Sequence, residues 1–249
     1  MSDLTPIVPA LFPESAVACG FTTRRGGVSK PPYDSLNLGF NTPDELSAVR
    51  ENHRILFRFL GVREANAAVM DQVHGSAVNV VTSGGISPAT DGIVTSRPGI
   101  VLTIRIADCV PLLLYDPVRM AAAAVHCGWR PLAGGVIENV LETMTGVLGV
   151  VPGEVIAALG PSAGPCCYEI GGEVAGRLLP GSVVRRDGKI YADLRDEVRQ
   201  RLVDSGLMLR SIETIPDCTI CNESLYFSHR RDGVLSGRMM GYIMIREKR

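Results

Sequence analysis

Residues 100–126 read IVLTIRIADCVPLLLYDPVRMAAAAVH and decide the fold of this chain. They contain three apolar runs, Ile100–Ile106, Leu112–Tyr115 and Ala121–His126, separated by polar or turn-forming residues. Short apolar runs with such boundaries are typical of buried β-strands. The pattern continues on both sides, where the further strand-like runs are Ala68–Val73, Ala77–Thr82, Val155–Leu159 and Ser211–Ile215.

Three segments between these runs have helical periodicity. Residues 42–61 form the clearest one, with Thr42 as the N-cap, Glu45 completing a capping box and Gly61 as the end. The other two are Ala133–Leu148 and Leu194–Val203. Helices and strands mix without regular alternation, which favours an α+β fold with mixed sheets over a doubly wound parallel sheet. We expect one domain over residues 1–249, because no repeat or linker divides the chain.

Composition restricts the possible functions. Hydrophobic residues make up 46% and charged residues 20% of the 249 residues, which is ordinary for a globular protein. The net charge of −1 provides no basic surface for nucleic acid or an acidic membrane. The N-terminal residues MSDLTP do not resemble a signal peptide, and seven cysteines, an odd number, do not suggest a disulfide framework. We therefore expect a soluble protein of the reducing cytoplasm.

Three residues of metal-ligand type stand at the ends of strand-like runs: His74, Cys109 and His126. Strand ends can converge at one edge of a sheet, and three protein ligands with one open position are typical of a catalytic zinc site. The alternative is that these side chains are only buried or hydrogen-bonded, since no local motif such as HExxH supports a metal.

Three further features are less specific. Arg130 stands at the start of GWRPLAGG, residues 128–135, where it could grip an anion beside a helix N-terminus or form only a surface salt bridge. Cys218 and Cys221 form a single CxxC without a second pair at zinc-ribbon spacing, which favours a structural role. His53 lies on the apolar face of the first helix and is expected in the core.

Seven motifs, taken in order, resemble the YfiH-like laccase-domain family, whose members are also called polyphenol oxidases or purine nucleoside phosphorylases. The motifs are TTRRGGVS (22–29), SLNLG (35–39), QVHG (72–75), ADCVP (107–111), AAVHCGWR (123–130), GPSAGPCCYEIG (160–171) and FSHRRDG (227–233). The resemblance implies a single domain with layered mixed β-sheets flanked by helices. It also implies a zinc site at His74, Cys109 and His126. Cys127 and Pro131 depart from the family's usual residues around GWR, and Pro131 bears on the expectation for Arg130.

The activity implied by this resemblance is zinc-dependent phosphorolysis of adenosine, inosine and methylthioadenosine, with adenosine deamination as a side reaction. On that basis we expect Arg130 to bind phosphate, and Asn37 and Gln72 to hydrogen-bond the base or the ribose. The expected partners are a small nucleoside and phosphate, without nucleic acid or a membrane. The sequence leaves the oligomeric state open.

Three alternatives stay open. Cys109 and His126 could serve as nucleophile and base of a cysteine hydrolase. The same site could hold copper and oxidise phenols, although the four histidines are too few to build a multicopper oxidase. Some members of the family are linked to the editing of peptidoglycan precursors.

Overall fold

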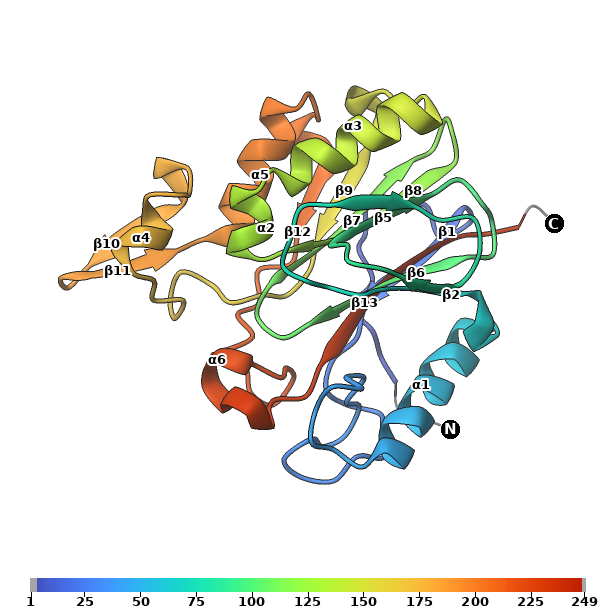
Figure 1. Ribbon diagram of the computed structural model, residues 1–249, viewed down its shortest axis with the longest axis horizontal. Coiled ribbons are helices and arrows are strands. Elements are labelled where there is room, and N and C mark those ends of the chain that lie inside the picture. The colour runs from blue at the N-terminus through green and yellow to red at the C-terminus, as the bar shows by residue number, and fades with distance from the viewer. Residues whose placement is uncertain (1–3, 248–249) are drawn as a thin grey trace.

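Two β-sheets lie face to face between helices in the computed structural model, which describes residues 4–247 (Figure 1). The first sheet has the order β1-β13-β6-β2-β4 and consists of Val17–Phe21, Met239–Ile245, Val101–Ile106, Ala67–Met70 and Gly85–Ser87. The second has the order β12-β9-β7-β8-β5-β3 and consists of Ile212–Thr214, Ile156–Leu159, Val110–Asp116, Ala121–Cys127, Gly92–Thr95 and Val78–Val80. A separate hairpin pairs β10 (Val183–Arg186) with β11 (Lys189–Ala192).

Helices cover the outer faces of both sheets. Helix α1 (Leu46–Leu60) packs on the first sheet, and α2 (Trp129–Ala133), α3 (Val136–Leu148) and α5 (Leu194–Asp204) pack on the second. The remaining helices are α4 (Gly172–Ala175) and α6 (His229–Asp232), with 3-10 turns at Glu64–Asn66, Pro152–Glu154, Pro180–Ser182, Leu209–Ser211 and Gly233–Leu235. Each sheet contains parallel and antiparallel pairs, which confirms the predicted single-domain α+β fold with layered mixed sheets. The extent of that domain over residues 1–249 stays a prediction.

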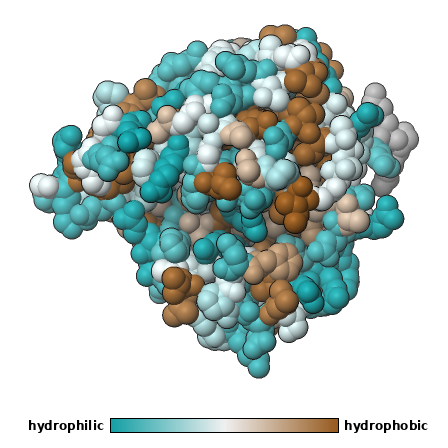
Figure 2. Space-filling view, in the orientation of Figure 1, coloured by the Kyte–Doolittle hydropathy of each residue, from teal (hydrophilic) through white to brown (hydrophobic). Residues whose placement is uncertain are grey.

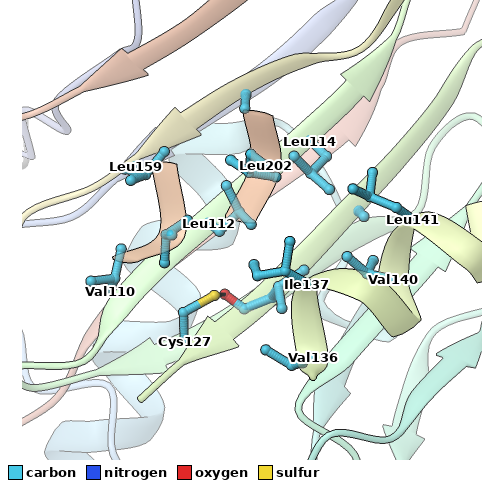
Figure 3. Close-up of a cluster of buried hydrophobic side chains, with 14 of the residues drawn as sticks. Val110, Leu112, Leu114, Cys127, Val136, Ile137, Val140, Leu141, Leu159 and Leu202 are labelled. Atoms are coloured by element: carbon cyan, nitrogen blue, oxygen red, sulfur yellow. Dashed lines mark hydrogen bonds between the residues drawn. The ribbon is translucent and has the colours of Figure 1, made fainter. Parts of the chain in front are cut away.

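The central strands are apolar along their length because both of their faces are buried. On β7, Leu112 and Leu114 face α3 and α5, whereas Leu113 and Tyr115 face the other sheet. This alternation follows from the two-residue period of a strand. Figure 3 shows the part of the core between the second sheet and its helices, where side chains of α3 and α5 meet those of β7 and β9. The visible surface mixes hydrophilic and hydrophobic residues (Figure 2). No helix in the described part of the chain is long and apolar enough to cross a membrane.

Two predicted helix starts are wrong. Helix α1 begins at Leu46 rather than after Thr42, because the Thr42 hydroxyl donates to the Gly39 carbonyl and accepts from Asn37. The segment Ala133–Leu148 is divided, since Gly135 adopts a left-handed conformation with φ 85° between α2 and α3. The predicted end of α1 at Gly61 is confirmed, with φ 69° at that glycine.

His53 is buried in α1 as predicted, and this position makes stability depend on pH. Its Nε2 donates to the Leu38 carbonyl at 3.0 Å, and burial lowers its pKa from the ordinary value of 6.5. As pH falls below 6.5, His53 becomes protonated in the unfolded chain but stays neutral in the folded chain. The free energy of unfolding therefore decreases. We expect the free energy of unfolding of the wild type to fall more steeply between about pH 8 and about pH 5 than that of His53→Gln. Urea unfolding at several pH values measures this difference, and parallel curves for the two proteins would disprove it.

Candidate metal centre

His126 lies near the end of β8, on the face that points toward the other sheet. Its neighbours in the strand alternate, so that Val125 and Cys127 face the helices while Ala122 and Ala124 face the other sheet. The two-residue period places His126 on the side of Ala122 and Ala124. The imidazole is therefore buried at the strand end, between the two sheets.

Cys109 lies in the connection that carries the chain from one sheet to the other. Strand β6 of the first sheet ends at Ile106, and β7 of the second begins at Val110. Asp108 makes the turn with φ 90°, a backbone conformation that L-residues rarely adopt. Its carboxylate accepts from the Thr219 hydroxyl at 2.7 Å and from the Arg230 N–H at 2.6 Å, which holds the strained turn in place.

His74 is held in a turn after β2 by a buried carboxylate. His74 itself has φ 56°, and such strain is common at functional sites. The Asp91 carboxylate accepts from the backbone N–H groups of Val73, His74 and Gly75 at 3.2, 3.2 and 2.6 Å. The same carboxylate accepts from His126 Nδ1 at 2.6 Å. Asp91 therefore fixes both histidines, and because it occupies Nδ1 of His126, Nε2 is the nitrogen that faces Cys109 and could bind a metal.

The three predicted ligands converge. One ligand atom each from His74, Cys109 and His126 lies within 4.8 Å of the others. Two donors of this kind on one tetrahedral zinc ion lie roughly 3.3–3.6 Å apart, which falls within that limit. Space for an ion depends on Gly128, since a Cβ there would lie 3.1 Å from Cys109 Sγ and 3.5 Å from His74 Nδ1. The carboxylate–histidine pair behind the site is the usual support of a metal-binding imidazole.

The electrostatics of the group favour a cation. Burial alone would lower the pKa of His126, but the charge of Cys109 and the hydrogen bond to Asp91 raise it to about 9. Burial opposes ionisation of Asp91, yet His126 and the backbone donors hold its pKa below its usual value. The pKa of His74 is lowered by burial and by the neighbouring His126. A metal ion would take the place of a proton on Nε2 of His126, while Nδ1 keeps its hydrogen bond to Asp91.

The metal-ligand group opens into a cavity of about 230 Å³. Besides the three ligands, the cavity is lined by Asn41, Gln72, Arg105, Ala107, His229 and Arg238. Burial lowers the pKa of both guanidinium groups, and incomplete hydration of Arg105 and Arg238 makes them strong anion binders. His229 donates from Nδ1 to the Gly233 carbonyl at 2.8 Å, which leaves its Nε2 as the ring nitrogen for a ligand.

The remaining predicted site residues are placed differently. Gln72 lines the cavity, and its amide pairs with the backbone N–H and carbonyl of Arg105 at 2.9 Å each. Asn37 is fully buried and does not reach the cavity, because its amide is used by Thr42, Asp44, Gly39 and the Arg238 N–H. Arg130 is exposed on α2, stacked 4.4 Å over Trp129, and its charge still lowers the pKa of His74.

Sequence reasoning missed Asp91, Arg105 and Arg238. Asp91 immediately precedes β5, and only the pairing of β5 with β8 brings it beside His126. Arg105 is the charged residue of the otherwise uncharged strand β6 (VLTIRI), and a charge within a buried strand is a usable signal for a side chain facing a site.

Comparison with known proteins agrees with this geometry. Residues 18–246 match the family described as "Multi-copper polyphenol oxidoreductase laccase". Purine nucleoside phosphorylase YfiH of Escherichia coli is 35% identical over 96% of this chain and 98% of its own. Purine nucleoside phosphorylase YlmD of Geobacillus stearothermophilus is 32% identical over 95% of this chain and 93% of its own. The crystal structure of that YlmD has a TM-score of 0.90 and covers 96% of this chain and 94% of the YlmD chain.

The chain therefore belongs to this laccase-like family, together with proteins named YfiH and YlmD, and the predicted resemblance is confirmed. Membership suggests the use of a metal, and residues able to hold one are present in the fold.

Proposed function

We propose that this protein is a zinc-dependent purine nucleoside phosphorylase that cleaves adenosine, inosine and methylthioadenosine, with adenosine deamination as a side activity. One observation carries the proposal: the His74–Cys109–His126 group, oriented by Asp91, opens into a cavity that is also lined by two partly buried guanidinium groups. Relatives over nearly the whole chain carry the name purine nucleoside phosphorylase. We expect the reaction to run in the cytoplasm, where the free cysteines stay reduced.

Phosphorolysis requires the protein to hold an anion against C1′ of the nucleoside. A phosphate oxygen forms a bond to C1′ while the bond from C1′ to the purine nitrogen breaks, and the electron pair leaves with the base. Arg105 and Arg238 line the cavity and are suited to bind and orient the phosphate. His229 Nε2 and the free N–H of Gln72 are suited to hydrogen-bond the nucleoside and to hold a proton near the departing base.

A bound zinc ion would supply a Lewis acid, which suits attack of water on C6 of adenine in the deamination side reaction. The protein's part is to aim both imidazoles at one point, which Asp91 does through His126 Nδ1 and the turn at His74. The same donors would also suit copper. We propose zinc because phosphorolysis and deamination involve no change of oxidation state and need no redox-active metal.

A cysteine hydrolase is the second candidate, because the Cys109 sulfur and a His126 ring nitrogen lie within 4.8 Å of each other. Metal content separates the two. A hydrolase with a Cys109 nucleophile would be inhibited by zinc, whereas the proposed phosphorylase requires it.

The assay that tests the proposal follows purified protein with adenosine or inosine, with and without inorganic phosphate. We expect free adenine or hypoxanthine and ribose 1-phosphate only when phosphate is present, and slow formation of inosine from adenosine without it. Release of base at the same rate in both conditions would indicate hydrolysis and overturn the proposal.

We propose that Arg130 contributes to phosphate binding, so its removal should weaken the apparent affinity for phosphate. Its side chain is exposed, so loss of one charge-assisted contact in Arg130→Ala should cost about 1–1.5 kcal/mol, or roughly tenfold in apparent phosphate affinity. Deamination uses water and should be spared. Arg130→Lys is the matched control, which keeps the charge but not the planar fork. Rates measured over a range of phosphate concentrations decide the matter, and an equal loss of both activities would remove Arg130 from this role.

A further inference from the structure

A second group of cysteines gathers away from the His74–Cys109–His126 group. One sulfur each from Cys166, Cys167, Cys218 and Cys221 lies within 4.8 Å of the other three. The first two cysteines come from the loop after β9, and the other two from the loop after β12. These strands pair in parallel, so both loops leave the sheet at the same edge.

We propose that these four cysteines bind a second metal ion, zinc, in a closed tetrathiolate site. Four thiolates without an open position are typical of structural zinc, and they differ in kind from the three-ligand group at the cavity. The proposal does not depend on which reaction the cavity performs.

The sulfur geometry is close to that of a metal site. Cys221 Sγ lies 3.1 Å from Cys167 Sγ and 3.5 Å from Cys166 Sγ. Zinc–sulfur bonds of about 2.3 Å in a tetrahedron place sulfur atoms roughly 3.8 Å apart, so little movement is needed. A disulfide needs about 2.05 Å between sulfurs, and all four cysteines are free. One sulfur with two near neighbours is a poor arrangement for a single disulfide and a good one for a shared ion.

The surrounding backbone supports thiolates at this place. The Gly164 N–H donates to Cys218 Sγ at 3.3 Å, and such a donor stabilises a negatively charged sulfur. The two loops are joined by hydrogen bonds from the Ser162 N–H to the Asp217 carbonyl and from the Thr219 N–H to the Ser162 carbonyl. The Arg195 guanidinium, which is mostly buried, donates to the carbonyls of Ile215 and Asp217 at 3.2 Å each. The ligand-bearing loops are thus held in register.

The position of this cluster would allow the second metal to stabilise the turn at Asp108, next to Cys109. Thr219 lies between Cys218 and Cys221, and its hydroxyl bonds the carboxylate of Asp108, the residue before Cys109. The Ala163 N–H, in the other loop, donates to the Asp108 carbonyl at 2.8 Å. An ion that ties the two loops together therefore also fixes the strained turn that presents Cys109 to the first site.

The sequence contained a signal for this site. The CxxC of Cys218 and Cys221 has no second CxxC, and on that ground it was interpreted as structural only. The missing pair is the adjacent Cys166-Cys167, which a search for ribbon spacing does not find.

Metal content per chain, measured by elemental analysis of protein purified under reducing conditions, tests the proposal. We expect two zinc ions in the wild type, one in Cys218→Ser/Cys221→Ser and one in His74→Ala/His126→Ala. Cys19→Ala, which removes a buried thiol outside both groups, should keep two. One zinc in the wild type that persists in the Cys218→Ser/Cys221→Ser variant would overturn the proposal.

Cobalt substitution keeps the test valid if the double cysteine variant does not fold. Cobalt bound to four thiolates in a tetrahedron gives intense thiolate-to-metal charge-transfer absorption, and the first site offers only one thiolate. We expect His74→Ala/His126→Ala to retain nearly all of this absorption and Cys166→Ser, a change at an exposed ligand, to lose about a quarter of it. A cobalt-loaded His74→Ala/His126→Ala protein without this absorption would contradict the second site. Neither result depends on nucleoside turnover, so failure of the proposed function would leave this test unchanged.

Discussion

Asp91→Asn should weaken zinc binding at the His74–Cys109–His126 group by 10- to 100-fold and destabilise the fold by about 3–5 kcal/mol. Asp91 is fully buried, and four N–H donors converge on its two oxygens. One oxygen accepts from Val73 and Gly75, and the other accepts from His74 and His126. Either orientation of an asparagine amide directs its NH₂ group at two of these donors, so the substitution cannot be accommodated by a flip.

Asp116→Asn is the matched control. Asp116 is also fully buried at a strand end, and its carboxylate accepts from the backbone N–H groups of Val118 and Arg119. It is the last residue of β7, at the other end of β7 and β8 from the candidate metal centre. We expect it to leave zinc affinity unchanged. Zinc affinity is read by competition with a chelator and stability by urea unfolding, and equal zinc affinities in Asp91→Asn and the wild type would refute the role of Asp91.

His74→Ala should lower phosphorolysis by about a thousandfold. A metal is worth several kcal/mol of transition-state stabilisation, and about 4 kcal/mol corresponds to that factor. His74 is the most exposed residue of the three ligands and lies in a turn, so its removal should leave the core intact. The matched control is His53→Gln, which changes a histidine in α1 and should retain the rate.

The measurement for His74→Ala is the initial rate of base release at saturating phosphate, with the zinc content of the same sample. Zinc loss and activity loss should occur together. A variant that has lost the zinc of this site and still cleaves adenosine at the wild-type rate would show that the metal has another purpose.

The sequence predicted the inner strands of the fold well because they are apolar and short. Leu112–Tyr115 and Ala121–His126 are parts of β7 and β8, with ends displaced by at most two residues. Strand β13, with the sequence MMGYIMI, was not predicted. It is buried at every position, as β7 and β8 are, but Gly241 interrupts its apolar run, and its partners β1 and β6 are distant in the chain.

The residues of the candidate site also include some that the sequence could predict and some that it could not. His74, Cys109 and His126 could be predicted because imidazole and thiol side chains at strand ends are uncommon and carry chemistry on their own. Asp91 could not, since a carboxylate before a strand is ordinary and its role depends on the register of β5 against β8. Asn37 is a related case: an amide suits a ligand and a buried loop equally, and here Thr42, Asp44 and the N–H groups of Gly39 and Arg238 bond to it.

The most direct test of the central claim is phosphate-dependent release of purine base from adenosine by one preparation, assayed as purified, after removal of all metal and after return of zinc. The account predicts activity in the first state, none in the second and recovery in the third, with no recovery in His74→Ala/His126→Ala. Full phosphorolysis by wild-type protein that elemental analysis shows to be free of metal would contradict it.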